Sequence, residues 1–119
     1  MPGISVHVVD VARGVVASGM RVELYAMSGA AAPRLIASGA ISPGGVLSDQ
    51  SLNQKFEPGY YEARFHVADY YRANPADGVA AVPFLDVVSY RFGLADPEAH
   101  YHLPMKLTPW GYSCFRGGA

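Results

Sequence analysis

Short apolar runs with turn residues between them dominate this chain of 119 residues. In the run 20–27, the apolar side chains of Val22 and Leu24 alternate with the charged side chains of Arg21 and Glu23. A period of two is typical of a strand that buries one face. Similar runs occupy 5–10, 34–41, 60–67, 84–92, 100–108 and 111–116, with turn sequences such as GAAAP at 29–33 and SPGG at 42–45 between them. Many short strands with regular turns predict an antiparallel β-sandwich.

Only one segment has the character of a helix. The sequence VADYYRAN at 67–74 is short, and Pro75 marks its expected end, because the residue before a proline avoids the helical conformation. The sequence contains no internal repeat, no low-complexity segment and no linker between domains. We therefore expect a single all-β domain over residues 1–119, with one short helix.

The composition of the chain excludes several classes of protein. Apolar residues make up 50% and charged residues 16%, which excludes a disordered chain. The formal net charge is -1 and no basic cluster occurs, so no nucleic-acid partner is expected. No stretch approaches the roughly 18 apolar residues of a membrane span, and the N-terminus does not resemble a signal peptide. We therefore expect a cytoplasmic protein. Few charges on a small globule also predict apolar subunit contacts and an oligomer.

Two histidines in the run 100–108 are the first candidates for chemistry. His100 and His102 are two residues apart, so a strand directs both imidazoles to one face, with Cα atoms roughly 6–7 Å apart. The opposite face of the same strand is apolar and is expected to join the core through Tyr101, Leu103 and Met105. The polar face of this strand therefore carries two imidazoles.

Two other histidines lie in strand-forming runs. His7 stands between valines, on the face of Ser5 and Val9, and His66 fits an ordinary packing residue. Neutral imidazoles could also bind zinc, but no His-x-x-x-His or Cys-x-x-Cys spacing supports such a site. Cys114, the single cysteine, could be a nucleophile or a small packing residue, and no Gly-x-Ser-x-Gly motif or phosphate-binding loop occurs. These patterns predict a β-sandwich with a histidine-rich face and leave its chemistry open.

Nearly the whole chain resembles the 5-hydroxyisourate hydrolase family, the transthyretin-like enzymes of purine catabolism. The resemblance is carried by SVHVVDVARGVVASGMRVELY near the start and AHYHLPMKLTPWGYSCFRGG near the end. The segments ISPGGVLSD, FEPGYYEARFHVADYY and VPFLDVVSYRF follow one another in the order of the family. The family implies a transthyretin-type β-sandwich of two four-stranded sheets with one short helix. It also implies a homotetramer whose active sites lie in a channel where dimers meet.

The resemblance also implies a reaction and the residues that perform it. In the family, water opens the six-membered ring of 5-hydroxyisourate at an amide-like bond, without a metal or an organic cofactor. His7 and His102 match the histidines that position and deprotonate this water, and either could be the base. Arg116 would anchor the tail or face the channel, where the chain end is expected to bring it together with the histidines. The expected substrate-binding residues are Val46, His100, Ser113, Phe115, Arg116 and Gly118.

Three departures from the family pattern bear on the substrate. Val46 stands where the family has an arginine after a D-G turn, and Phe115 and Gly118 replace the tyrosine and the serine of the terminal Y-R-G-S motif. The loss of one donor to a transition-state charge typically costs about 10²–10³ in rate. The substrate could be a more apolar, N-methylated hydroxyisourate from methylxanthine catabolism, which lacks the matching polar groups. Alternatively, the protein could be a non-catalytic, transthyretin-like binder of an apolar ligand. The retained His7 and His102 favour the hydrolase.

Overall fold

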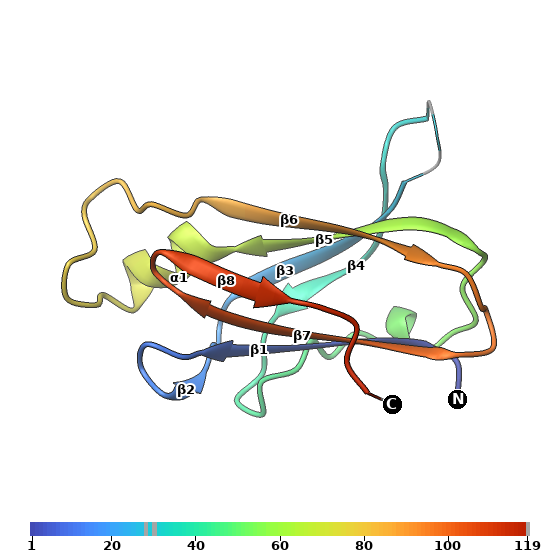
Figure 1. Ribbon diagram of the computed structural model, residues 1–119, viewed down its shortest axis with the longest axis horizontal. Coiled ribbons are helices and arrows are strands. Elements are labelled where there is room, and N and C mark those ends of the chain that lie inside the picture. Colours follow the sequence, from blue (N-terminus) through green and yellow to red (C-terminus); the bar gives the residue numbers. More distant parts are fainter. Residues whose placement is uncertain (28, 30, 119) are drawn as a thin grey trace.

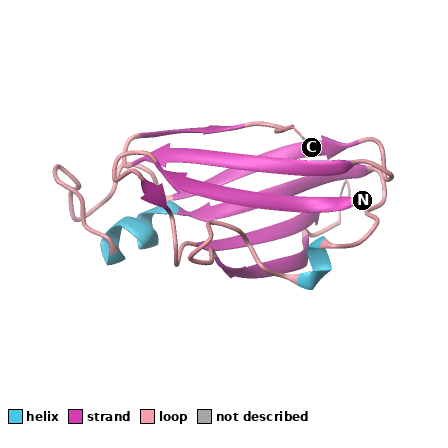
Figure 2. Cartoon of the chain, turned by 90° about the horizontal axis from the view of Figure 1, so that it is seen from below, coloured by secondary structure: helices cyan, strands magenta, loops and turns pink. Residues whose placement is uncertain are grey.

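Two four-stranded β-sheets pack face to face in the computed structural model, which describes residues 1–27, 29 and 31–118 (Figure 1). The first sheet has the strand order β2–β1–β7–β8 and the second has the order β4–β3–β5–β6. The strands are β1 (Gly3–Asp10), β2 (Val15–Val16), β3 (Arg21–Met27), β4 (Arg34–Ala40), β5 (Gly59–His66), β6 (Val87–Leu94), β7 (His100–Thr108) and β8 (Gly111–Cys114). The α-helix α1 (Val67–Ala73) and the 3₁₀ helix η1 (Gln50–Leu52) lie at opposite ends of the sandwich (Figure 2). The predicted fold is confirmed.

Each predicted run contains a strand, although some strands are shorter than their runs. β6 begins at Val87 rather than at residue 84, and β8 ends at Cys114 rather than at residue 116. Neither β2 nor η1 is predicted by the sequence pattern, because two or three residues are too few to show a period. The expected turn at 29–33 includes Ala30, which lies outside the described residues. Within the described part of the chain, no helix is long and apolar enough to cross a membrane.

The first sheet is not wholly antiparallel, which corrects the predicted arrangement. β1 and β7 run parallel, in a register that pairs Ser5 with His102 and His7 with Pro104. Antiparallel neighbours can be joined by a hairpin, whereas a parallel pair needs a long connection. β1 and β7 are separated by most of the chain, so no hairpin fixes their relative direction. This parallel pair brings the two ends of the sequence together in the middle of the sheet.

The core lies between the two sheets and is made by alternate residues of the long strands. On β7, Tyr101, Leu103 and Met105 are all buried, as the sequence predicts, and on β1 Ile4 and Val6 are buried beside them. Residues one position away in each strand therefore point out of the sandwich. This alternation leaves the histidines of both strands on the outer face of the first sheet.

A buried carboxylate ties the end of β1 to the helix. Asp10 is fully buried, and its two oxygens accept hydrogen bonds from the hydroxyl groups of Tyr70 (2.9 Å) and Tyr71 (3.0 Å). The backbone N–H of Arg13 donates a third hydrogen bond to the same carboxylate (3.2 Å). A buried charge needs such partners, because its desolvation is otherwise costly. Burial, and next the bond to Asp10, raise the pKa of Tyr71, so its hydroxyl stays a donor at neutral pH.

Candidate active site

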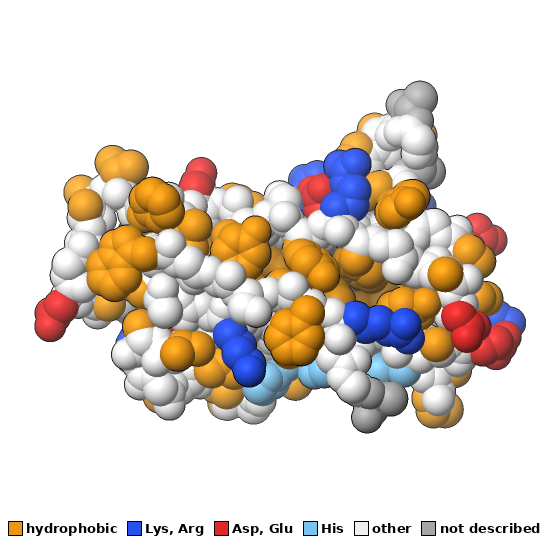
Figure 3. Space-filling view, in the orientation of Figure 1, with side chains coloured by type: hydrophobic (Ala, Val, Ile, Leu, Met, Phe, Trp, Pro, Cys, Tyr) orange, Lys and Arg blue, Asp and Glu red, His pale blue; other side chains and the backbone are white. Residues whose placement is uncertain are grey.

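The parallel pair of β1 and β7 gathers four polar side chains on the outer face of the first sheet. Ser5 and His7 come from β1, while His100 and His102 come from β7. All four are partly buried, and we call this group the histidine face. Histidine atoms lie in a row along these strands in the space-filling view, beneath apolar and basic side chains (Figure 3). Two strands that are distant in sequence thus form one continuous imidazole-lined surface.

The hydroxyl of Ser5 joins the two histidines of β7. Its Oγ lies 2.8 Å from Nε2 of His100 and 2.6 Å from Nδ1 of His102. The strand register explains these contacts, because Ser5 is the direct partner of His102 in the parallel ladder. With Nδ1 bonded to the serine, Nε2 is the nitrogen of His102 that is left to act on a substrate.

The environment of His102 favours its neutral form. Burial is the largest cause that lowers the pKa of this imidazole, and the neighbouring His7 and His100 lower it further. Taking a charged imidazolium out of water is costly, and a second positive charge nearby adds repulsion. A neutral imidazole at neutral pH can accept a proton, as a general base must.

A tight turn at 42–46 lies against His7. The backbone N–H of Val8 donates to the carbonyl of Gly45 (2.9 Å), and His7 pairs with Val46 in an isolated antiparallel bridge. A Cβ atom at Gly45 would lie 2.6 Å from Nε2 of His7 and 2.7 Å from Cγ1 of Val16. Since Gly45 also has a φ of +88°, only glycine fits at this position without strain. The turn therefore fixes the place of the His7 ring.

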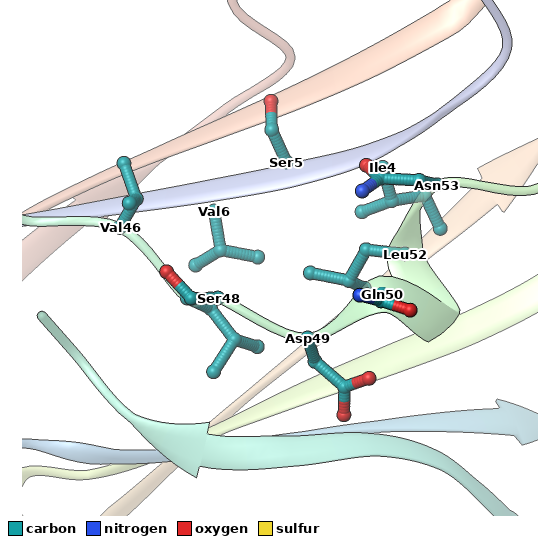
Figure 4. Close-up of a pocket in the computed structure, with 10 residues that line it drawn as sticks. Ile4, Ser5, Val6, Val46, Ser48, Asp49, Gln50, Leu52 and Asn53 are labelled. Carbon is teal, nitrogen blue, oxygen red and sulfur yellow. The ribbon is translucent and has the colours of Figure 1, made fainter.

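The same turn places an apolar side chain beside the histidines. Val46 is 40% exposed, and it points to the same side of β1 as Ser5, whereas Val6 points to the other side (Figure 4). Direct partners in an antiparallel pair share a face, so Val46 and its partner His7 both lie on the outer face. The predicted substrate-binding position 46 is thereby next to the histidine face, with an isopropyl group in place of a charge.

The C-terminal tail returns to β7 and reaches His102. Gly117 donates its N–H to the carbonyl of His102 (2.7 Å), and a Cβ atom at Gly117 would lie 2.9 Å from Cδ2 of that ring. The guanidinium of Arg116 lies 4.0 Å from the centre of the Tyr101 ring, a residue of the opposite face. Arg116 directly precedes Gly117, the partner of His102, and its approach to the histidines stays a prediction. This cation–π contact would hold the tail in place.

The remaining predicted binding residues lie at different distances from His102. Phe115 is 43% exposed and lies two residues before Gly117, next to the site. Ser113 pairs with Lys106 on β7, roughly 13 Å along the strand from His102. Gly118 is exposed and follows the pair formed by Gly117 and His102. Phe115 and Gly118 are thus near the histidine face along the chain, whereas Ser113 is remote from it.

Alternatives raised by the sequence lose support from the geometry. Nε2 of His66 lies 2.9 Å from a carboxylate oxygen of Glu23 on the second sheet, away from the other histidines. Burial raises the pKa of Cys114 to about 11, so its thiol is protonated at neutral pH and is a poor nucleophile. No cluster of three or more metal-ligating side chains occurs among residues 1–27, 29 and 31–118.

A groove opens between β1 and the segment 46–53, beside the histidine face. It has a volume of about 500 Å³ and shares Ser5 and Val46 with that face (Figure 4). Its other walls are Ile4, Val6 and the segment 47–50 with Leu52 and Asn53. On this side the histidine face is therefore bordered by a mixed, largely apolar surface.

Three residues of the site escape the sequence analysis. Ser5, Gly45 and Gly117 touch the imidazoles or border them closely, yet none carries a motif of its own. The only signal for Ser5 is its position two residues before His7, on the same face of a strand. The need for glycine at positions 45 and 117 becomes clear only from the structure, where the rings of His7 and His102 lie against them.

Comparisons with known proteins agree with this fold. The chain matches the HIUase/Transthyretin family over residues 4–117. It is 42% identical over 118 residues to a 5-hydroxyisourate hydrolase of Deinococcus radiodurans, covering 98% of this chain and 96% of that protein.

Two solved structures are similar as well. (S)-allantoin synthase has a TM-score of 0.87 and 29% identity, covering 98% of this chain and 43% of the synthase, so this chain spans less than half of that protein. Transthyretin from Sparus aurata has a TM-score of 0.78 and 22% identity, covering 97% of this chain and 96% of its own, a likeness that shows the fold alone. Because the family match covers nearly every residue, this chain belongs to the HIUase/Transthyretin family.

Proposed function

We propose that this protein is a hydrolase that opens the ring of 5-hydroxyisourate, or of a close analogue, in purine catabolism. The observation that carries the proposal is the histidine face, where a neutral His102 lies beside His7 and His100. The proposal is supported by the 42% identity to a protein named as a 5-hydroxyisourate hydrolase. The chain is also similar to part of (S)-allantoin synthase, with 29% identity and a TM-score of 0.87.

The first step is the activation of water by an imidazole. An unprotonated nitrogen of His102 or His7 accepts a proton from water, and the water oxygen bonds to the ring carbonyl carbon. A general base of this type contributes about 10²–10⁴ in rate. The lowered pKa of His102 keeps this imidazole free to accept the proton at neutral pH. No metal is needed for the step as written.

The second step breaks the ring. The tetrahedral carbon expels the ring nitrogen, and the imidazolium returns its proton to that nitrogen. The atoms balance, because water adds one hydroxyl to the carbon and one hydrogen to the nitrogen. The imidazole is neutral again at the end, so the cycle needs no cofactor.

We propose further that the preferred substrate is more apolar than the parent compound. The proposal is supported by Val46, whose isopropyl group borders His7 where a charged donor would otherwise stand. An N-methyl group on the substrate replaces an N–H donor, and apolar contact with Val46 then costs no unpaired hydrogen bond. Phe115 and Gly118 add an apolar ring and an open space near the same face. An N-methylated hydroxyisourate, from methylxanthine catabolism, fits these changes.

The active form is proposed to be a homotetramer that encloses the histidine face. This proposal is supported by the partial exposure of the histidines on an open sheet face and by the transthyretin fold. A second subunit over this face would exclude water and complete the pocket. Light scattering coupled to size-exclusion chromatography measures the subunit number directly, and a monomer that retains full activity would contradict this proposal.

One kinetic experiment tests the function and the substrate together. Purified protein is mixed with 5-hydroxyisourate or its trimethylated analogue, each generated in situ, and the ultraviolet absorbance is followed against spontaneous decay. We expect both decays to accelerate, the methylated compound more strongly. Acceleration of the parent alone would refute the substrate proposal. If neither decay accelerates, the hydrolase proposal fails, and binding of an apolar ligand to the same site becomes the function to measure.

A further inference from the structure

The hydroxyl of Ser5 has a position that the proposed hydrolysis does not yet use. It comes from β1, while both of its ring partners, His100 and His102, come from β7. The two distances, 2.8 Å and 2.6 Å, are both those of ordinary hydrogen bonds. Ser5 is only partly buried, so water could have satisfied its hydroxyl without these contacts. The arrangement links two imidazoles of the site through a single oxygen.

The chemistry of a hydroxyl limits how this link can be made. A serine hydroxyl has one proton to donate and two lone pairs with which to accept. It can therefore donate to only one imidazole, and it must accept from the other. Either His102 carries its proton on Nδ1 and Ser5 donates to His100, or Ser5 donates to His102 and the proton of His102 is on Nε2. The tautomers of His100 and His102 are therefore coupled through the single proton of the Ser5 hydroxyl.

We propose that Ser5 is a positioning residue that holds His102 as the Nδ1–H tautomer and so leaves Nε2 as the base. In this arrangement Nδ1–H of His102 donates to Ser5, and the Ser5 hydroxyl donates to Nε2 of His100. This inference rests on the proposed hydrolase function, because only a base needs a bare Nε2. It also selects His102 as the histidine that takes the proton from water.

This direction of the hydrogen bonds remains valid through the reaction cycle. When Nε2 of His102 accepts a proton, Nδ1–H is still present and still donates to Ser5. No hydroxyl has to turn and no bond has to break at the moment of proton transfer, which is the benefit of a preorganised site. In the opposite arrangement, in which Ser5 donates to Nδ1 of His102, Nε2 of His102 already carries a proton and cannot accept another. The second arrangement is therefore incompatible with Nε2 of His102 as the base.

Substitution of Ser5 tests the proposal kinetically. Ser5→Ala removes the hydroxyl and leaves the strand intact, whereas Ser5→Thr keeps a hydroxyl at the same position. We expect Ser5→Ala to lower kcat by at least about tenfold, which is part of the 10²–10⁴ that a general base supplies, with KM little changed. Ser5→Thr is expected to restore most of kcat. The matched control is Ser89→Ala, an exposed serine on β6 of the other sheet, which should leave both constants unchanged.

Nitrogen-15 NMR of the histidine rings tests the tautomer without any turnover. In the unmodified protein at neutral pH, the His102 ring should carry its proton on Nδ1, and Ser5→Ala should shift the ring toward a mixture of tautomers. A ring protonated on Nε2 in the unmodified protein would overturn the proposal. So would a folded Ser5→Ala variant with unchanged kcat. If the protein hydrolyses neither compound but the Nδ1–H tautomer is found, the proposed function fails while the link through Ser5 stands.

Discussion

Replacement of Gly45 by alanine tests whether the turn at 42–46 fixes the His7 ring. The φ of Gly45 is +88°, a conformation that costs a residue with a Cβ about 1–2 kcal/mol. The new Cβ would also lie 2.6 Å from Nε2 of His7 and 2.7 Å from a methyl group of Val16. Real Cβ atoms do not approach so closely, so the ring or the turn must move. We expect Gly45→Ala to lower the free energy of unfolding by at least about 1 kcal/mol.

The same substitution should also reduce activity, because it displaces a residue of the site. A misplacement of about 1 Å in a catalytic arrangement can cost about 10² in rate. The assay is kcat/KM for ring opening, together with urea unfolding at a fixed protein concentration, because an oligomer unfolds in a concentration-dependent way. Gly44→Ala is the matched control, since its Cβ would meet only Oγ of Ser42, at 3.6 Å. If Gly45→Ala matches Gly44→Ala in both measurements, the turn does not determine the position of the ring.

Two further perturbations have defined outcomes. Tyr71→Phe leaves the buried Asp10 with one partner fewer and should lower the free energy of unfolding by about 1–3 kcal/mol, measured by urea unfolding against the exposed Tyr112→Phe; equal losses would contradict this role. The pKa of His102 is lowered from 6.5, chiefly by burial, so activity limited by this base should fall only below pH 6.5 in a kcat profile. The folded state then binds fewer protons than the unfolded state, so this group's contribution to stability is present above pH 6.5 and is lost on acidification. An activity loss centred above pH 6.5 would contradict this assignment.

The strands and the core are readily predicted from the sequence because their signal is local. A period of two along β7 separates Tyr101 and Leu103 from His100 and His102, and each residue's face follows from its neighbours. The same rule places His7 and Ser5 together on β1. The direction of β1 relative to β7 has no local signal, because no hairpin joins these strands. The antiparallel prediction was wrong at that pair for this reason.

The parts of the site that escape prediction depend on contacts across the sheet. Ser5 becomes a partner of His102 only through the parallel register. The tail illustrates the same limit, because nothing in its sequence indicates that the guanidinium of Arg116 packs on the ring of Tyr101. A motif names the residue types that return to a site, but contacts between distant segments decide where each side chain lies.

The rate of 5-hydroxyisourate decay with His102→Asn, compared with the unmodified protein, tests the account most directly. We expect the unmodified protein to accelerate the decay and the variant to lose about 10²–10⁴ of kcat, the contribution of a general base. His66→Asn is the matched control, because that ring is bonded to Glu23 on the other sheet and should leave kcat unchanged. A folded His102→Asn variant that retains the rate of the unmodified protein would contradict catalysis by the histidine face.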